Sequence, residues 1–314
     1  MKIGKVSQSI YERSVLKQFH KDQIENQKSA GKDCAFFCAS ETFSLNSEEV
    51  AALTISMAAN DLIAQGGTPR QVSINLILTT RQSEAFLKKV MAAASAAMAI
   101  YDIILSACSV EVVDAVMAPI ACVSVFGAGV ASFPGATSGQ DVVMSKWIGL
   151  GATAIIATIK EEELLLKYPK HLLEKAKSFS AELSVLPEAA LAVKFGVSAM
   201  CHVNKGGVFG ALWEMADKAG VGLIIDLKKI PVKQETIEIS EVYDSNPYEL
   251  LGCGSLLMVT DDGHDLVRKL NLEGISAKVI GKTTDNNDRI LLNEGESRFL
   301  EPTKPDEIIK ILAM

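Results

Sequence analysis

The first clear periodicity along the chain is a helical one, which begins after Asn46. Apolar residues recur every three or four positions until Gly66–Gly67, where the pair of glycines ends the pattern. Asn46 and Glu49 have the spacing of a capping box at the start of this helix. The elements predicted in the first part of the chain are helices over 47–65 and 83–98 and strands over 72–78, 103–110 and 119–127.

Residues 132–139 are rich in turn formers, and strands and helices alternate after them. Strands are predicted over 141–146, 221–226, 255–260 and 275–281, and helices after Gly149–Thr153, over 169–183 and 187–195, after Gly207, and over 233–243, 263–270 and 305–312. No sustained run of parallel strands is indicated. The pattern therefore predicts an α+β protein rather than a doubly wound sheet.

Length and composition add the domain count. A chain of 314 residues with 48% hydrophobic residues is long enough for two domains, for which we predict the bounds 1–133 and 134–314. The net charge of −7 and the absence of a basic cluster argue against nucleic acid as a partner. The six cysteines form no Cys-x-x-Cys pair and are expected to be reduced, mostly buried thiols.

One apolar run, 91–107, has the length of a possible membrane segment. Asp102 interrupts it, and its alanine-rich front and β-branched rear indicate a helix followed by a strand. The start of the chain lacks the apolar region of a signal peptide. We therefore expect a soluble, cytoplasmic protein that does not enter a membrane.

Two places in the sequence suggest chemistry. Gly206–Gly207 opens a helix that ends at Gly220, with Asn204 as the expected N-cap, and such a helix start can bind an anion or can merely form a tight turn. Asp61 follows Asn60 in the last turns of a helix, where the helix dipole disfavours a negative charge. It is either a ligand of Mg²⁺ or phosphate or a solvated residue at a helix end.

The string from Phe195 through Met200 and Gly206–Gly207 to Asp226 resembles the family of aminoimidazole ribonucleotide (AIR) synthase. This family includes selenophosphate synthetase, thiamine-monophosphate kinase and the hydrogenase maturation factor that dehydrates a carbamoyl group, and the chain is most similar to the maturation-factor branch. The resemblance implies an N-terminal α+β domain that pairs into a dimeric β-barrel and a C-terminal α/β sandwich. A homodimer is therefore expected.

The resemblance also implies ATP and Mg²⁺ as cofactors. Asn60–Asp61 matches an Asn-Asp pair of the family, and Gly31-Lys-Asp33-Cys-Ala35 matches its Gly-x-Asp-x-Ala turn. Carried over position by position, the implied metal ligands are Asp33 and Asp61. The implied nucleotide-site residues are Asp33, Asn60, Asp61, Glu111, Thr153, Gly206 and Gly207.

The chain departs from the family at several polar positions. His202 and Asn204 replace an aspartate and a threonine before the glycine pair, and Gly151 replaces a glutamate. Of the family's Gly-Gly-His-Thr-Glu, the segment 107–111 keeps only Glu111. Glu41 lies near the position of another lost aspartate, and the sequence leaves open whether it or His202 compensates. The apolar frame stays intact, which indicates a degenerate member of the family.

Two functions follow from these departures. The first is a maturation-factor-like protein with weak or no ATP-dependent catalysis, which acts by binding a partner. The second is an active enzyme that phosphorylates an amide or carboxylate oxygen of a small substrate or a partner protein. The chain ends in Met314, and no cysteine stands where the maturation factor carries its carbamoyl acceptor, so that particular reaction is not expected. The sequence names neither a substrate nor a catalytic residue.

Overall fold

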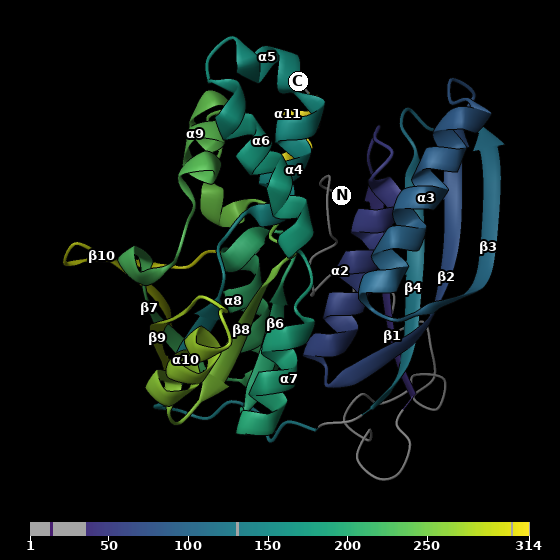
Figure 1. The fold of residues 1–314 in the computed structure, drawn as a ribbon. Helices are drawn as coiled ribbons and strands as arrows, with labels where there is room; N and C mark the ends of the chain where they lie inside the picture. The colour runs from purple at the N-terminus through teal and green to yellow at the C-terminus, as the bar shows by residue number, and fades with distance from the viewer. Residues whose placement is uncertain (1–12, 15–35, 130–131, 303, 314) are drawn as a thin grey trace.

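Two sheets with their helices lie side by side in the computed structural model, which describes residues 13–14, 36–129, 132–302 and 304–313. Figure 1 shows the first unit, which ends with β4 (Ile120–Gly129), beside the second, which begins with β5 (Asp141–Ser145). The predicted domain boundary at 133/134 falls between these two strands. Among the described residues, no helix combines the length and the apolar content that crossing a membrane requires.

The first unit is a four-stranded sheet with two helices on one face. Its strand order is β1-β4-β2-β3, and β2–β3 is the parallel pair. Its other elements are β1 (Phe36–Ser44), α2 (Val50–Ala64), β2 (Gly67–Thr79), α3 (Glu84–Ile100) and β3 (Ile104–Val113).

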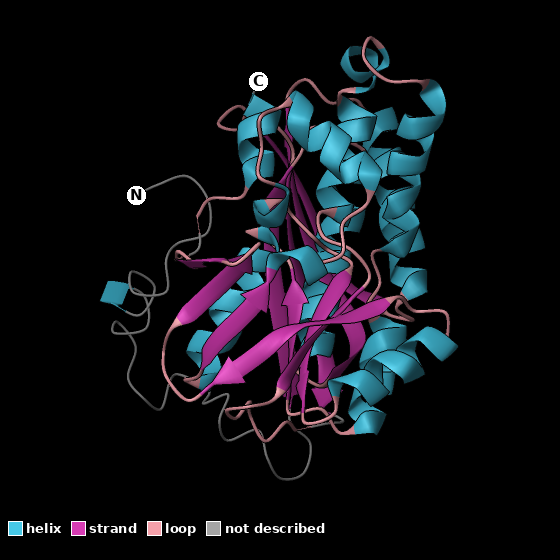
Figure 2. Cartoon of the chain, turned by 90° about the vertical axis from the view of Figure 1, so that its left-hand side faces the viewer, coloured by secondary structure: helices cyan, strands magenta, loops and turns pink. Residues whose placement is uncertain are grey.

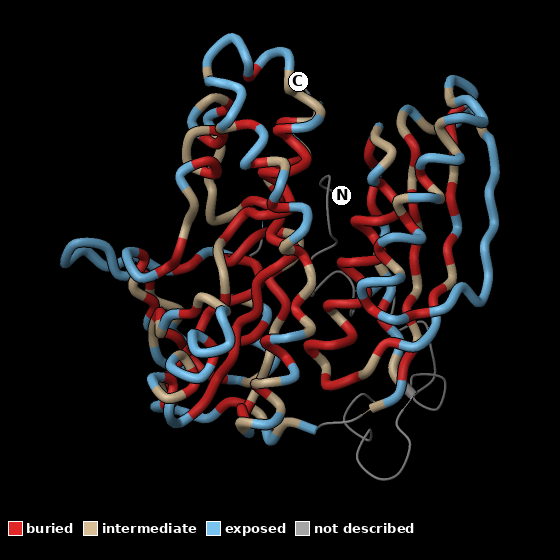
Figure 3. The backbone as a smooth tube through the Cα atoms, in the orientation of Figure 1, coloured by how far each residue is buried: buried red, intermediate tan, exposed pale blue. Residues whose placement is uncertain are grey.

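Helix α2 is the central element of the molecule. Every residue from Val50 to Ala64 except Asp61 is buried, because the helix packs on β1, β2 and β4 with one side and on β6 (Ala199–Val203) and α7 (Leu186–Phe195) of the second unit with another. A predominantly apolar helix is expected in such a position, and the hydroxyls of Thr54 and Ser56 are satisfied by carbonyls of the same helix. Figure 3 shows this buried layer between the two units.

The second unit is a mixed seven-stranded sheet of order β11-β10-β7-β9-β5-β8-β6, in which β7–β10 is the parallel pair. Figure 2 shows this unit in front, viewed from the side that lies away from the first unit. Its remaining elements are α4 (Leu150–Ile159), α5 (Glu161–Leu165), α6 (Lys170–Ser178), α8 (Gly207–Ala219), β7 (Gly222–Asp226), α9 (Gln234–Val242), β8 (Ser255–Thr260), α10 (Gly263–Leu272), β9 (Ala277–Thr284), β10 (Arg289–Asn293), β11 (Glu296–Phe299) and α11 (Glu307–Ala313).

Both faces of this sheet are covered at its centre. Val142 and Met144 of β5 join the cluster around α8, while Val143 between them joins the cluster that continues through α2 into the first unit. Successive side chains of a strand point to opposite faces, so β5 and β8 are buried on both sides. One apolar core therefore spans the two units and fixes their relative position.

The α+β class predicted from the sequence is confirmed, as are most of the predicted helices. Strands β1, β6, β10 and β11 were not predicted. In β1 and β6 the reason is a polar residue at an inward position, which breaks the alternation. In β1 that residue is Glu41, between buried Ala39 and Phe43, and in β6 it is His202.

Two local predictions are wrong. Asn46 does not cap α2, because its carboxamide oxygen accepts a hydrogen bond from Gln82 and the N-cap position belongs to Glu49. The cysteines are not mostly buried. Of the five in the described residues, only Cys253 is buried, whereas Cys38 and Cys122 lie on the sheet face that α2 and α3 leave uncovered and Cys108 lies on the edge strand β3.

The uncovered face of the first sheet is open in the single chain. Across its centre lies a row of small polar side chains, in which Ser40 of β1 and Ser124 of β4 are hydrogen-bonded at 2.7 Å between their hydroxyl oxygens. Strand β3 at the edge is exposed along nearly its whole length. The described strands form no closed barrel, and the dimeric barrel implied by the family stays a prediction.

Candidate functional site

Two acidic side chains of the first unit meet the segment that joins β6 to α8. Glu41 comes from β1 and Asp61 from the last turn of α2, while His202, Asn204 and Lys205 come from the second unit. We call these five residues the interdomain network. The sequence analysis singled out Asp61, and the structure now places Glu41 beside it.

Asp61 is bound by His202. The two side chains meet at 2.7 Å between Asp61 Oδ1 and His202 Nδ1, and the histidine side chain is only 1% exposed. The other ring nitrogen, Nε2, lies 3.3 Å from the amide nitrogen of Asn60. Because an amide nitrogen can only donate, Nε2 accepts and Nδ1 carries the hydrogen that Asp61 accepts. Both ring nitrogens are thus used within the protein.

Asn60 is fully engaged as well. Besides His202, its amide nitrogen donates to the carbonyl of Leu183 at 2.7 Å. Its carboxamide oxygen accepts from the hydroxyl of Tyr101 at 3.0 Å and from the backbone N–H of Val185 at 3.2 Å. An asparagine side chain offers two donors and two acceptor positions, and all four are occupied here.

Asn204 and Lys205 bind the second carboxylate. The Asn204 amide donates to both Glu41 Oε1 and Asp61 Oδ2, at 3.1 Å each. The Lys205 ammonium forms an ion pair with Glu41 Oε2 and donates to the carbonyl of Thr42 at 2.8 Å. Burial, followed by the charge of Asp61, raises the pKa of Glu41, and Lys205 counteracts this.

Asn204 is therefore not the N-cap of α8, which corrects the sequence prediction. Gly206 holds the N-cap position in a left-handed conformation, with φ of 80°. The amide nitrogen of Asn204 donates to the two carboxylates instead, and hydrogen bonds to charged acceptors are the stronger ones. Its buried carboxamide oxygen, which would have to accept from the helix in a cap, has no hydrogen-bond partner among the described residues.

The first glycine of the pair, Gly206, already binds an anion, and that anion is the side chain of Asp306. The backbone N–H of Gly206 donates to Asp306 Oδ2 at 2.7 Å, and the N–H groups of Leu251 and Ile308 donate to Oδ1 at 3.1 and 2.9 Å. Asp306 is 6% exposed. Burial raises its pKa to about 6, while the three N–H donors act in the opposite direction.

The remaining predicted residues do not join the network within the described chain. Thr153 is buried in α4, where its hydroxyl contacts that of Thr236 at 2.9 Å. Glu111 lies on β3, at the opposite edge of the sheet from Glu41 and three strand spacings away, or about 14 Å. Its register partner is Ile77, so it points to the uncovered face. Asp33 lies outside the described residues.

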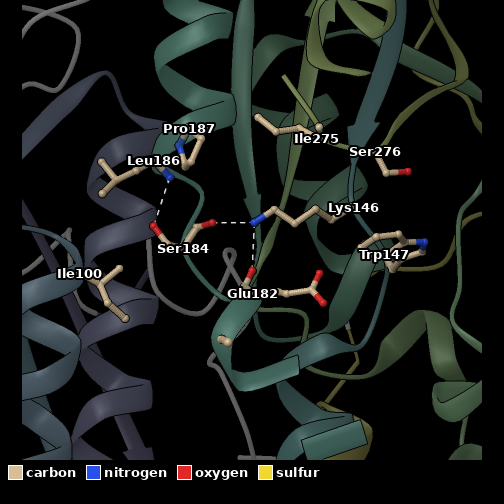
Figure 4. A pocket seen from close by; sticks show the side chains of 11 residues that line it. Ile100, Lys146, Trp147, Glu182, Ser184, Leu186, Pro187, Ile275 and Ser276 are labelled. Carbon is tan, nitrogen blue, oxygen red and sulfur yellow. Dashed lines mark hydrogen bonds between the residues drawn. The ribbon is translucent and has the colours of Figure 1, made fainter. Parts of the chain in front are cut away.

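A pocket of about 420 Å³ lies where the end of α3 meets the second unit (Figure 4). Lys146 on its wall donates to the carbonyls of Glu182 and Ser184 at 2.9 and 2.6 Å and pairs with Glu188 at 2.9 Å. These contacts use all three ammonium hydrogens, so Lys146 links the end of β5 to residues 182–188 within the second unit rather than facing a ligand. None of the residues predicted for the site lines this pocket.

Sequence reasoning missed Lys205, Tyr101 and Asp306. Pro305-Asp306-Glu307 ahead of an apolar helix is a recognisable N-cap signal for α11, and Asp306 does accept from Ile308. Its second contact, with Gly206 a hundred residues earlier, has no local signal.

Comparison with known proteins identifies the family. The N-terminal domain of AIR synthase related protein matches residues 23–131, and the C-terminal domain matches residues 137–292. The chain belongs to the AIR synthase related protein family. The resemblance expected from the sequence is thereby confirmed.

Curated relatives of this family member are distant. A putative hydrogenase expression/formation protein of Methanocaldococcus jannaschii is 24% identical over 255 residues, which cover 78% of this chain and 73% of the relative. Carbamoyl dehydratase HypE of Rhodobacter capsulatus is 24% identical, with coverages of 74% and 69%. Phosphoribosylformylglycinamidine synthase subunit PurL of a Thermoanaerobacter strain is 27% identical over 54% of this chain, which spans only 22% of that relative.

Solved structures share the fold. A chain of the HypE–HypF complex superposes with a TM-score of 0.74 at 19% identity and covers 93% of this chain and 99% of its own length. Hydrogenase maturation protein HypE in complex with ATP gives a TM-score of 0.67 at 16% identity, with 98% of both chains covered. At these identities the likeness concerns the fold alone.

Proposed function

We propose that this AIR synthase related protein is a hydrogenase maturation factor-like protein that works by binding a partner protein, with weak or no ATP-dependent catalysis. The observation that carries the proposal is the interdomain network. Its two carboxylates, Glu41 and Asp61, are bound by His202, Asn204 and Lys205 of the same chain.

The residues present do not fit a Mg²⁺·ATP site. A magnesium ion requires several oxygen ligands in near-octahedral geometry, and here an ammonium, an amide and an imidazole occupy the positions around the carboxylates. The described residues contain no group of three or more His, Cys, Asp or Glu side chains arranged to hold a metal ion. Asn60 has no hydrogen-bonding capacity left for a nucleotide.

A protein partner is proposed from the structural neighbour in which HypE is bound to HypF. That neighbour shares the fold over 93% of this chain, and the proposal is that a partner protein binds the same scaffold here. The homodimer implied by the family is part of this proposal, since the uncovered sheet face of the first unit is free to meet a second copy.

The second candidate is an active ATP-dependent enzyme that phosphorylates an amide or carboxylate oxygen. It is favoured by the pairing of Glu41 with Asp61, which share the Asn204 amide and so bring together two carboxylates that a metal ion could bridge. The HypE structure with ATP belongs to the same fold. In this case Lys205 would have to leave Glu41 when the nucleotide arrives.

Calorimetric titration with ATP and Mg²⁺ separates the two. The wild-type protein is expected to give no saturable heat up to millimolar ATP. The double variant His202→Asp/Asn204→Thr restores the family residues and should gain Mg²⁺-dependent binding at least tenfold tighter, or about 1.4 kcal/mol. The variant His171→Asp/Asn271→Thr makes the same changes at exposed positions and should gain nothing.

The outcomes are distinct. Saturable, Mg²⁺-dependent binding by the wild-type protein at micromolar ATP would overturn the proposal and favour the second candidate, the active ATP-dependent enzyme. A folded double variant without any gain would show that the lost polar residues are not what prevents binding.

A further inference from the structure

The N-terminus of α8 is occupied by a carboxylate of the same chain. Three backbone N–H groups from three separate segments converge on Asp306: Gly206 at the start of α8, Leu251 before β8, and Ile308 in α11. All three of these residues are buried. Convergent N–H groups at the start of a helix form an anion-binding position, and the positive end of the helix dipole adds to it.

The position is built for an anion rather than for a neutral group. Asp306 is itself 6% exposed, and among the described residues no cation forms an ion pair with it. Its negative charge is therefore balanced by oriented peptide dipoles. With a pKa raised to about 6 by burial, the carboxyl is ionised at pH 7. The nearest charge that acts on it is the carboxylate of Glu307, which repels it.

We propose that Asp306 is an internal anion that closes the N-terminus of α8 to phosphate groups and fastens α11 to the second unit. This inference rests on the proposed function, because it explains how the family's phosphate position is filled without a nucleotide. Lys205 takes the place of a cation beside Glu41, and Asp306 takes the place of an oxyanion beside Gly206. The chain thus supplies a positive charge through Lys205 and a negative charge through Asp306, both from its own side chains.

Gly207, next to the position of the carboxylate, packs closely against the backbone of residues 248–250. A Cβ atom there would lie 2.4 Å from the carbonyl oxygen of Tyr248 and 2.8 Å from that of Leu250. The backbone on one side of the glycine is therefore already packed. The N–H group of Gly206 is occupied by the Asp306 carboxylate, so an added oxyanion has to displace that side chain.

The test is replacement of the carboxylate by a free oxyanion in the full-length chain. Asp306→Ala removes the internal anion, and formate, acetate and inorganic phosphate are the probes. We expect the variant to unfold several degrees below the wild type and to regain midpoint temperature saturably with formate or phosphate. Wild type should respond to these salts no more than to chloride at equal ionic strength. Glu301→Ala, an exposed carboxylate in the same segment, is the matched control.

A folded Asp306→Ala protein that responds to the oxyanions only as it does to chloride would overturn the inference. Wild-type protein that binds phosphate as tightly as the variant would overturn it too. If Asp306→Ala does not fold, Asp306→Asn keeps the shape and removes the charge. Its Gly206 amide should then exchange with solvent at least tenfold faster than in wild type, and unchanged exchange would refute the role of Asp306.

The two proposals fail separately. Magnesium-dependent ATP binding by the wild-type chain would overturn the proposed function. The oxyanion titrations of Asp306→Ala contain neither Mg²⁺ nor nucleotide, so they judge the internal anion alone.

Discussion

A carboxylate that leaves water needs an opposite charge or several hydrogen-bond donors, and this chain provides both from its own residues. Glu41 is 15% exposed at its side chain and faces Lys205, whereas Asp306 relies on three peptide N–H groups. Asp61 receives one hydrogen from His202 and one from Asn204. At the scale of single residues, His202 and Asn204, two of the positions where the sequence suggests a departure from the family, bind the carboxylates Asp61 and Glu41.

Lys205→Met should leave Glu41 buried beside Asp61 without its cation. We expect a loss of about 2 kcal/mol in the free energy of unfolding at pH 7.5, since breaking a partly buried pair strands a charge. The pKa of Glu41 is already raised by burial and would rise further, so the folded state would take up a proton more readily than the unfolded state. The loss should therefore shrink as the pH falls toward 5.

Urea denaturation at the two pH values measures this effect. Lys88→Met is the control, because the Lys88–Glu84 pair is 74% and 79% exposed and should change stability by less than about 0.5 kcal/mol. A loss for Lys205→Met that is the same at pH 5 and pH 7.5 would speak against a stranded carboxylate.

At the scale of elements, β1 and β6 carry Glu41 and His202 of the candidate site, and both are among the strands that the sequence analysis did not predict. In each strand one polar residue, Glu41 or His202, stands at an inward position where the alternating pattern calls for an apolar side chain. The residue that carries the candidate chemistry thus also removes the apolar signal by which the strand is recognised. Helices α2 and α8, by contrast, were predicted correctly, because α2 carries apolar residues at helical spacing and both helices end in glycine signals.

Gly207 and Gly220 mark the two ends of α8 and make a matched pair for a stability test. Both have left-handed backbones, with φ of 62° and 67°. An added Cβ at Gly207 would clash with the Tyr248 carbonyl, while at Gly220 it would meet nothing within 4 Å. We expect Gly207→Ala to cost about 3 kcal/mol and Gly220→Ala about 1 kcal/mol, the cost of the conformation alone. Equal losses in chemical denaturation would contradict the packing described here.

At the scale of the whole molecule, one core runs through α2 from the first sheet into the second. The interdomain network lies on this same interface, so the two carboxylates of the first unit and the three polar residues of the second are held in fixed register. The single chain leaves two surfaces of the first unit open. They are the sheet face opposite α2 and the exposed strand β3.

A homodimer through that open face should sediment at about twice 33.6 kDa at micromolar concentration. Ser124→Arg places a long charged side chain at the centre of the face and should shift the protein to a monomer. Leu166→Arg, at a position that is 87% exposed in the second unit, should leave the dimer intact. A wild-type monomer would count against the dimeric barrel that the family implies.

The sequence by itself determined the α+β class and the family. It also predicted a division into two units and a role for Asp61 and for the glycine pair, and these stay predictions. These depend on local periodicity and on short motifs, which are readable along the chain. Only the tertiary structure decided what those groups contact. Asp61 meets His202 and Glu41 meets Lys205 across more than a hundred residues of sequence, and Asp306 meets Gly206, a hundred residues earlier. Which side chains meet depends on how the elements pack against one another. No local pattern along the chain contains that geometry.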